Sequence, residues 1–248
     1  MTVARLDYSP EALAPFGRDK ILLEANTDIE KSMRLNACDK EPWTVALIES
    51  LRQGESFWDI GANVGAYSLL AAIRGAQVVA FEPVAENYAT LCRNLALNGI
   101  ESSVVTLPFA LGDQDAMIWQ HRSDLRSGAA SHVLSASGTK QGFHQTLIPI
   151  LTASTAQMLF GLLPPNVIKI DVDGFELQVL QGLEAVLANS TVRAIMLEVH
   201  RAQEEALGAW LGGHGWGVAE QYPQRGDVHY ALCQPVAVGV RAGPVAVG

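Results

Sequence analysis

The stretch WDIGANVGAYS, from Trp58 to Ser68, decides the fold that the rest of the sequence predicts. Residues 56–60 form a short apolar strand, Gly61 to Gly65 form a tight turn, and a helix follows from Ala66 to Ile73. Glycines let the backbone of such a turn approach a ligand closely, and the helix start offers free N–H groups. This arrangement is typical of nucleotide-cofactor sites in α/β proteins, although a turn needed only for packing is the alternative.

Strands and helices alternate on both sides of this stretch, which predicts a mostly parallel sheet with helices on both faces. The predicted strands are residues 56–60, 77–81, 103–107, 167–170 and 193–199, and the predicted helices are residues 43–51, 66–73, 85–97, 176–188 and 202–211. A closing hairpin at residues 217–220 and 228–232 would add an antiparallel edge strand.

The length of 248 residues fits one large α/β domain. We expect an N-terminal segment at residues 1–40, a main domain at 41–235 and a tail at 236–248. Residues 113–150, which are rich in Ser, Gly, His and Gln, interrupt the alternation. They predict a hairpin and a mobile loop inserted into the domain.

Composition excludes several classes of protein. The formal net charge of −9 disfavours nucleic acid as a partner. Cys38, Cys92 and Cys233 show neither metal-ligand spacing nor a disulfide pattern, and Cys92 is expected to be a small core residue. The N-terminus lacks the apolar run of a signal peptide, and no apolar stretch is long enough for a membrane span. We therefore expect a soluble, cytoplasmic protein.

The glycine turn favours a cofactor without phosphates. In the G-x-G-x-x-G turn of dinucleotide-binding enzymes the middle glycine makes room for a pyrophosphate, but Asn63 stands at that position here. A cofactor with an amino-acid end fits better, because Asp59 could hold its ammonium group and loop N–H groups its carboxylate. Glu82 directly follows the next strand, in VVAFEPVAENY, where a carboxylate can accept hydrogen bonds from both ribose hydroxyls. An exposed glutamate at a strand end is the alternative.

Two further strands end in acidic residues. Asp171 and Asp173 end the strand of VIKIDVDGFELQVLQG, and Lys169 inside that strand is expected to pair with an acid. Glu198 ends the strand of AIMLEVH, and His200 follows it. Because the carboxyl ends of parallel strands meet at one edge, Asp171, Glu198 and His200 are the candidate catalytic residues. They could act as a general base or bind a divalent metal of the magnesium–manganese type, and a structural role is the alternative for His200.

These segments, in this order, resemble the FkbM family of S-adenosylmethionine-dependent methyltransferases over about Glu41 to His200. The motifs that carry the resemblance are D-x-G-A-N-x-G at Asp59–Gly65, F-E-P at Phe81–Pro83, L-x-x-N-L-x-L-N-G at Leu91–Gly99, A-L-G-D at Ala110–Asp113, I-K-I-D-V-D-G-F-E at Ile168–Glu176 and L-E-V-H at Leu197–His200. Each motif alone is weak, whereas the ordered set is specific.

The resemblance implies a class I methyltransferase fold: a Rossmann-like, seven-stranded, mostly parallel sheet whose last strand is antiparallel. It also implies O-methylation of a sugar or natural-product hydroxyl, with S-adenosylmethionine as cofactor and a small molecule or glycan as acceptor. The cofactor-binding residues expected from the motifs and the resemblance together are Asp59, Gly61, Asn63, Gly65, Glu82, Pro83, Ala110 and Asp171.

The sequence departs from the family pattern in two places. Residues 151–159, LTASTAQML, lack the acid that the family often has before the I-K-I-D strand, and Asp173 stands where a glutamate is usual. Two other functions stay open: a nicotinamide-dependent oxidoreductase, which Asn63 disfavours, and a non-catalytic binding protein with a methyltransferase-like fold.

The inserted segment is the candidate acceptor site, and the N-terminal segment is a second place for substrate residues. The alternatives are a hairpin that only covers a sheet edge and, for its histidines, a solvated polar loop. An aromatic ring can cover the apolar face of a sugar while imidazoles bind its hydroxyls. Glycines could let the segment close over the acceptor. The residues that offer these features are Trp119, His121, His132, His144, Gly128, Gly138 and Gly142.

Overall fold

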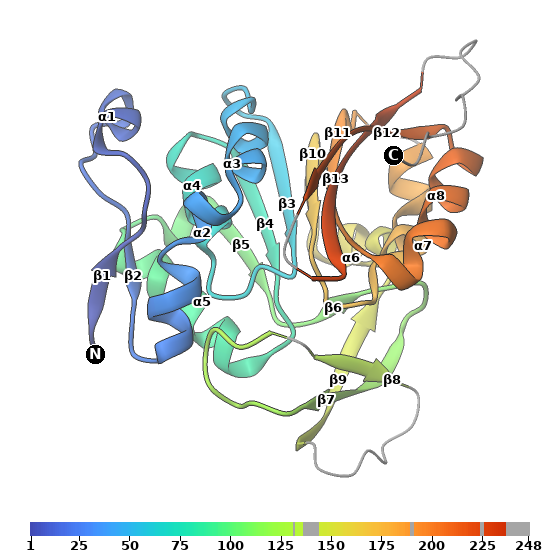
Figure 1. Ribbon diagram of the computed structural model, residues 1–248, viewed down its shortest axis with the longest axis horizontal. Coiled ribbons are helices and arrows are strands. Elements are labelled where there is room, and N and C mark those ends of the chain that lie inside the picture. The colour runs from blue at the N-terminus through green and yellow to red at the C-terminus, as the bar shows by residue number, and fades with distance from the viewer. Residues whose placement is uncertain (131, 136–143, 189–190, 224–225, 237–248) are drawn as a thin grey trace.

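The structure, a computed structural model, describes residues 1–130, 132–135, 144–188, 191–223 and 226–236. Its centre is a seven-stranded sheet in the order β12-β13-β11-β10-β3-β4-β5 (Figure 1). These strands are β3 (Ser56–Ile60), β4 (Gln77–Phe81), β5 (Val104–Leu107), β10 (Val167–Ile170), β11 (Ala194–His200), β12 (Trp216–Pro223) and β13 (Val228–Pro235). The neighbours from β11 to β5 are parallel, and β13 is antiparallel to both β11 and β12. The predicted class I fold is confirmed, although β12 rather than the last strand forms the edge.

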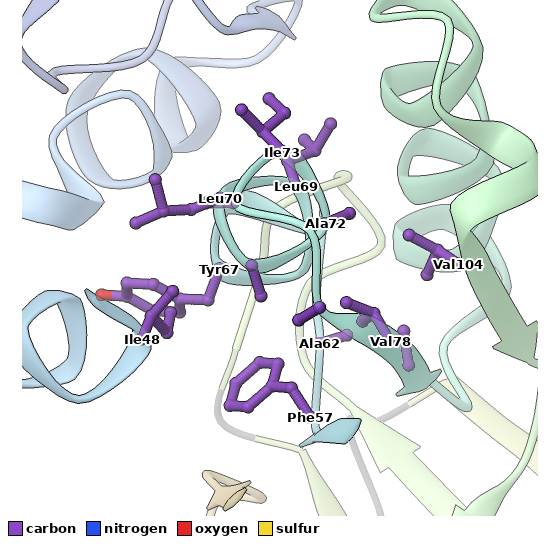
Figure 2. Close-up of a cluster of buried hydrophobic side chains, with 14 of the residues drawn as sticks. Ile48, Phe57, Ala62, Tyr67, Leu69, Leu70, Ala72, Ile73, Val78 and Val104 are labelled. Atoms are coloured by element: carbon purple, nitrogen blue, oxygen red, sulfur yellow. The ribbon is translucent and has the colours of Figure 1, made fainter. Parts of the chain in front are cut away.

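Helices cover both faces of this sheet. One face carries α3 (Pro42–Glu49), α4 (Ala66–Ile73) and α5 (Ala85–Leu97), and the other carries α6 (Ala153–Phe160), α7 (Glu176–Ala188) and α8 (Glu204–Gly213). Alternate residues of each strand face opposite cores. Phe57 and Val78 pack under α4, as Figure 2 shows, whereas Trp58 and Val79 belong to the core on the other face. This two-faced burial explains why the strands are continuously apolar.

The strand order reverses between β3 and β10, and open α/β sheets bind ligands at such a point. Gly61, directly after β3, has φ +84°, and a Cβ there would lie 1.9 Å from the Asp171 carbonyl oxygen. Only glycine fits this position, so the loops after β3 and β10 touch through their backbones.

Residues 113–150 contribute to a second sheet in the order β6-β9-β7-β8, which lies below the central sheet in Figure 1. Its strands are β6 (Ala110–Leu111), β7 (Ala116–Arg122), β8 (Val133–Ser135) and β9 (His144–Leu151). The antiparallel pair β7–β9 confirms the predicted hairpin. Part of the predicted mobile loop, with Gly138 and Gly142, lies outside the described residues.

The first forty residues pack against the same core as α4 and α5. They form β1 (Val3–Arg5), β2 (Leu22–Glu24), α1 (Pro10–Leu13), α2 (Ala37–Lys40), a 3-10 turn at Ala14–Phe16 and a π-type turn at Glu30–Arg34. Two asparagines of α5 hold β2 in place. Asn94 Oδ1 accepts the N–H of Glu24 at 2.8 Å, and Asn98 Oδ1 accepts the N–H of Leu22 at 3.0 Å. Both asparagines belong to the L-x-x-N-L-x-L-N-G motif, which therefore fastens the N-terminal segment.

Several smaller expectations differ from the structure. Cys92 is not a core residue, because it is half-buried with its Sγ 3.8 Å from Thr106 Oγ1; all three cysteines are free. Short 3-10 turns occur at Glu101–Ser103 and at Arg201–Gln203, where α8 was expected to begin. Within the described ranges, no helix is both long enough and apolar enough to cross a bilayer.

Gly182 of α7 lies against the backbone of Gly112, and a Cβ at Gly182 would be 1.8 Å from the Gly112 carbonyl oxygen. Gly182→Ala should therefore lower the free energy of unfolding by about 1–3 kcal/mol, because backbone on one side must move. Gly208→Ala in α8 is the matched control, since nothing lies within 4 Å of its Cβ. There, alanine should raise stability by about 0.5–1 kcal/mol. Urea unfolding measures both values, and equal effects would contradict the close contact.

Candidate active site

A cavity with about 930 Å³ of unoccupied space, its open mouth included, lies where the strand order reverses. The loops after β3, β4 and β10 build one wall, and the N-terminal segment and the second sheet build the others. The predicted site residues that line it are Gly61, Asn63, Glu82, Pro83, Ala110, Asp171 and Glu198. Asp59, Gly65 and His200 do not line it.

The N–H groups of the glycine loop are already used within the protein. Those of Gly61 and Ala62 both donate to the Phe81 carbonyl at 3.0 Å, and those of residues 64 and 65 donate to oxygens of the loop itself. The expectation that these groups hold a cofactor carboxylate is therefore wrong. Their role is to fix the loop against the end of β4.

Glu82 is the buried acid at the end of β4, with an exposed fraction of 4%. Its Oε2 accepts the N–H of Asn63 at 2.7 Å, and its Oε1 accepts the N–H of Val84 at 2.8 Å. Burial raises the pKa of Glu82 to about 7, against the lowering effect of these two hydrogen bonds. A carboxylate has about four lone-pair sites, so two remain for hydroxyl donors in the cavity.

Asp59 and Gly65 support the glycine loop from the protein interior and do not line the cavity. Asp59 is completely buried, and its Oδ2 accepts the Ser68 hydroxyl at 2.6 Å. A Cβ at Gly65 would lie 2.3 Å from Leu91 Cδ1. The structure therefore gives Asp59 no direct access to a ligand ammonium group in the cavity.

Asp171 is held by two neighbours. The Lys169 Nζ donates to its Oδ2 at 2.8 Å, and the Tyr230 hydroxyl donates to the same oxygen at 3.0 Å. Burial raises the pKa of Asp171, but the charge and hydrogen bond of Lys169, together with Glu198 and Arg34, hold that pKa below its ordinary value. The prediction that Lys169 pairs with an acid is confirmed. Because Asp171 is kept ionised by a fixed cation, it is a poor proton acceptor.

Glu198 lines the cavity, and His200 stands behind it with its Nε2 3.5 Å from Glu198 Oε2. Burial, together with the nearby Asp171 and Asp173 carboxylates, raises the pKa of Glu198 to about 10. The predicted set of possible metal ligands was Asp171, Glu198 and His200, but in the structure Glu176 takes the place of Asp171 in this set. One ligand atom from each of Glu176, Glu198 and His200 lies within 4.8 Å of the others.

Sequence reasoning missed Glu176 because it opens α7 instead of ending a strand. It is completely buried, and its Oε1 accepts the N–H groups of Gly174 at 3.0 Å and Val172 at 3.3 Å. The only signal in the sequence was its place at the end of the I-K-I-D-V-D-G-F-E motif.

Residues 127–130 cross over the glycine loop and the start of α5. The Ala129 carbonyl accepts from Asn63 Nδ2 at 3.0 Å and from Asn87 Nδ2 at 3.2 Å. The Gly128 carbonyl accepts from Arg34 Nε at 3.0 Å and Nη2 at 2.7 Å, and its N–H donates to Asn87 Oδ1 at 2.8 Å. This part of the insertion is fastened on both sides, so the expectation that Gly128 is a hinge is wrong.

Among the predicted loop histidines, His132 reaches the cavity. His121 is buried in β7, and His144 is exposed at the start of β9. Trp119 does not line the cavity, because alternation along β7 places its neighbour Gln120 in the wall instead. The expected aromatic platform is therefore wrong.

The His132 ring lies beside the Asp173 carboxylate. Its Nδ1 is 3.8 Å from Asp173 Oδ2, and its backbone N–H donates to the same oxygen at 3.3 Å. Burial, helped by the positive charges of Arg122 and Arg34, lowers the pKa of His132 to about 4. The imidazole is therefore neutral at pH 7, but the low pKa makes it a weak base, so a role in proton transfer rests on its position in the cavity wall.

The N-terminal segment supplies wall residues for which the sequence offered no motif: Met33, Arg34 and Lys40 line the cavity. The same residues border an adjoining recess of about 390 Å³ on the other side of the glycine loop. Lys169 and Asp171 also line this recess.

This arrangement agrees with a comparison against known families, in which residues 59–217, well over half of the chain, match the methyltransferase FkbM domain. The chain belongs to the FkbM methyltransferase family. Membership makes it a methyltransferase and sets aside the nicotinamide-dependent oxidoreductase.

Two characterised relatives are similar along much of the chain. The hexuronic acid methyltransferase AglP of Haloferax volcanii is 28% identical over 156 residues, which span 62% of this chain but only 59% of AglP. The 31-O-demethyl-FK506 methyltransferase FkbM of Streptomyces tacrolimicus is 29% identical over 212 residues, 70% of this chain and 77% of that protein.

Solved structures show the same fold as this family member. An FkbM methyltransferase from Methylobacillus flagellatus superimposes with a TM-score of 0.50 at 18% identity, covering 74% of this chain and 45% of that one. A precorrin-6y C5,15-methyltransferase from Geobacter metallireducens gives 0.51 at 13% identity, covering 87% and 94%.

The raised pKa of Glu82 predicts pH-dependent stability. In the folded protein Glu82 keeps its proton up to about pH 7, whereas the unfolded chain releases it near the ordinary value. The folded state therefore binds more protons between these values, and stability must fall as the pH rises through them. Relative to Glu82→Gln, the wild type should lose free energy of unfolding between about pH 4.5 and about pH 7. Urea unfolding across this range measures the difference, and a constant difference would contradict the assignment.

Proposed function

We propose that this methyltransferase transfers the methyl group of S-adenosylmethionine to a hydroxyl oxygen of a sugar or natural product. The observation that carries the proposal is the wide cavity at the strand switch point, with the glycine loop and buried Glu82 in its wall. The names of the two relatives point the same way, since one names a hexuronic acid and the other an O-demethyl compound.

The residues present fit this cofactor. The two free lone-pair sites of Glu82 suit ribose hydroxyls, and the bare backbone at Gly61 leaves room for close approach. Asn63, Pro83 and Ala110 border the same space. The carboxylates in the wall favour a positively charged sulfonium. When bound, the cofactor supplies an electrophilic methyl group, and its transfer to a hydroxyl oxygen breaks the carbon–sulfur bond and releases the hydroxyl proton.

The recess behind the glycine loop suits the amino-acid end of the cofactor. Because the loop N–H groups are engaged, the cations of Arg34 and Lys40 replace them as partners for a carboxylate. Asp171 lines both the recess and the cavity, so it takes the role of ammonium partner that the sequence assigned to Asp59. Asp59 and Gly65 then support the site from inside.

His132 is proposed to accept the hydroxyl proton. Its Nε2 has no hydrogen-bond partner among the described residues, and the ring lies in the cavity wall beside Asp173. Asp171 and Glu198, which line the same cavity, are proposed to accept hydrogen bonds from acceptor hydroxyls. His200, which stands behind Glu198, acts as a positioning residue.

Calorimetry tests the cofactor assignment. The wild type should bind S-adenosylmethionine and not nicotinamide cofactors. Glu82→Ala should weaken binding by about 1.5–3 kcal/mol for each lost charge-assisted hydrogen bond. Glu101→Ala, at an exposed 3-10 turn, is the matched control and should bind like the wild type. Unchanged affinity in Glu82→Ala would remove this residue from the cofactor site, and no binding by the wild type would overturn the proposed function.

The role of His132 is tested by turnover. With labelled S-adenosylmethionine and a panel of hexuronic acids, neutral sugars and hydroxylated natural products, His132→Gln should lower kcat by about 10²–10⁴-fold, as expected for loss of a proton acceptor. Its cofactor affinity should not change. His144→Gln, at an exposed position, is the control. Equal rates for the two variants would exclude His132 as the proton acceptor.

A further inference from the structure

We infer that Glu176, Glu198 and His200 form a binding site for one divalent transition-metal ion beside the cavity. The first residue opens α7, and the other two end β11, so two separate elements bring the ligands together. One carboxylate oxygen from each glutamate and one imidazole nitrogen lie within 4.8 Å of one another. Carboxylate and imidazole are the usual nitrogen and oxygen ligands of such ions.

Each of the three side chains carries a buried polar atom without a hydrogen bond, although His200 Nε2 and Glu198 Oε2 lie 3.5 Å apart. Glu176 Oε2, Glu198 Oε2 and His200 Nε2 are all buried and have no hydrogen-bond partner in the described part of the chain. Glu176 is completely buried, and its other oxygen is fixed by the N–H groups of Val172 and Gly174. A buried carboxylate oxygen without a partner costs about 1–3 kcal/mol or more. Orienting hydrogen bonds on the far oxygen are what a metal-binding carboxylate typically has.

The surrounding charge favours a cation. The carboxylates of Asp171, Asp173 and Glu176 all act on Glu198. The nearest buried ammonium, that of Lys169, is already paired with Asp171 at 2.8 Å. A divalent ion would be attracted by these carboxylates and would replace a proton held among them, whereas an anion would be repelled.

The geometry needs some adjustment. Donor atoms bound to one ion at about 2.1 Å lie roughly 3.0–3.4 Å apart in octahedral or tetrahedral geometry. His200 Nε2 and Glu198 Oε2 are already 3.5 Å apart, and atoms now within 4.8 Å must close by at most about 2 Å. The two-oxygen, one-nitrogen donor set suits Mn²⁺ or Zn²⁺ better than Ca²⁺, which takes six to eight oxygens.

Three protein ligands leave coordination positions open. Because Glu198 lines the cavity, these positions adjoin the space where an acceptor would lie. An acceptor with adjacent oxygens, such as a sugar acid, could fill them and be oriented by the ion. This role toward the acceptor rests on the proposed function, whereas metal binding itself does not.

The test is direct metal binding. Protein stripped with a chelator is titrated with Mn²⁺, followed by the electron paramagnetic resonance of the free ion, and separately with Zn²⁺ by calorimetry. The wild type should bind one equivalent of one of these ions. Glu176→Gln, which keeps the oxygen that accepts the backbone N–H groups, and His200→Gln should each bind more weakly by at least the ~10–100-fold that loss of a supporting contact costs.

A matched pair of controls exists on the surface. His214 Nε2 lies 3.6 Å from Glu184 Oε1, nearly the distance between His200 and Glu198, but Glu184 is exposed. Glu184→Gln and His214→Gln should bind the metal like the wild type. Thermal unfolding of the metal-free variants checks folding; if Glu176→Gln does not fold, His200→Gln decides the matter, since the His200 side chain is 33% exposed.

Two results would overturn the inference: a wild type that binds neither ion, or variants of Glu176 and His200 that bind as tightly as the wild type. In the first case a shared proton satisfies the cluster, and in the second the metal binds elsewhere. S-adenosylmethionine calorimetry on the same samples separates this outcome from failure of the proposed function, because either ligand can bind without the other.

Discussion

The ion pair between the buried Lys169 and the partly buried Asp171 fixes the position of the loops around the site. It joins the interior of β10 to the loop that follows, and Tyr230 of β13 bonds the same carboxylate oxygen. The carbonyl of Asp171 in turn lies against Gly61, so the glycine loop can take its position only while the loop after β10 stays in place. Removal of the Asp171 carboxylate would leave the Lys169 ammonium, which is 2% exposed, buried without this partner, at a cost of up to about 3–5 kcal/mol. Asp171 therefore contacts three parts of the chain where the strand order reverses: β10, the glycine loop after β3, and β13.

The cavity is held in shape before any ligand arrives. The glycine loop uses its own N–H groups to grip the end of β4, and the loop is covered by residues 127–130. Gly128 in this stretch is hydrogen-bonded to Asn87 of α5 and to Arg34 of the N-terminal segment. The insertion and the N-terminal segment thus form two walls of the cavity, and hydrogen bonds hold residues 127–130 of the insertion to both α5 and the N-terminal segment. Such preorganisation places catalytic groups without a further cost in ordering them.

The sequence predicted the central domain well because periodicity and strand ends carry the information. The strands at residues 56–60, 77–81 and 167–170 have the predicted bounds, and the acids that follow the last two, Glu82 and Asp171, both line the cavity. Strand ends alone therefore identified two acids that the structure brings to one cavity.

What the sequence could not predict depends on register and on long-range contacts. Whether Trp119 or Gln120 faces the cavity is a matter of one residue along β7, and nothing in the sequence sets that alternation relative to the site. Arg34 reaches Gly128 across 94 positions, a contact that no local pattern encodes. Glu176 escaped notice because a helix start, not a strand end, carries it to Glu198.

A crystal structure with bound S-adenosylhomocysteine tests the central claim most directly, because it shows where the cofactor lies on the sheet. The account predicts the ribose hydroxyls within hydrogen-bond distance of the Glu82 carboxylate, the amino-acid end in the recess beside Arg34 and Lys40, and the sulfur facing the part of the cavity between Glu198 and His132. A product molecule bound away from the switch point, or one whose ribose makes no contact with Glu82, would contradict it.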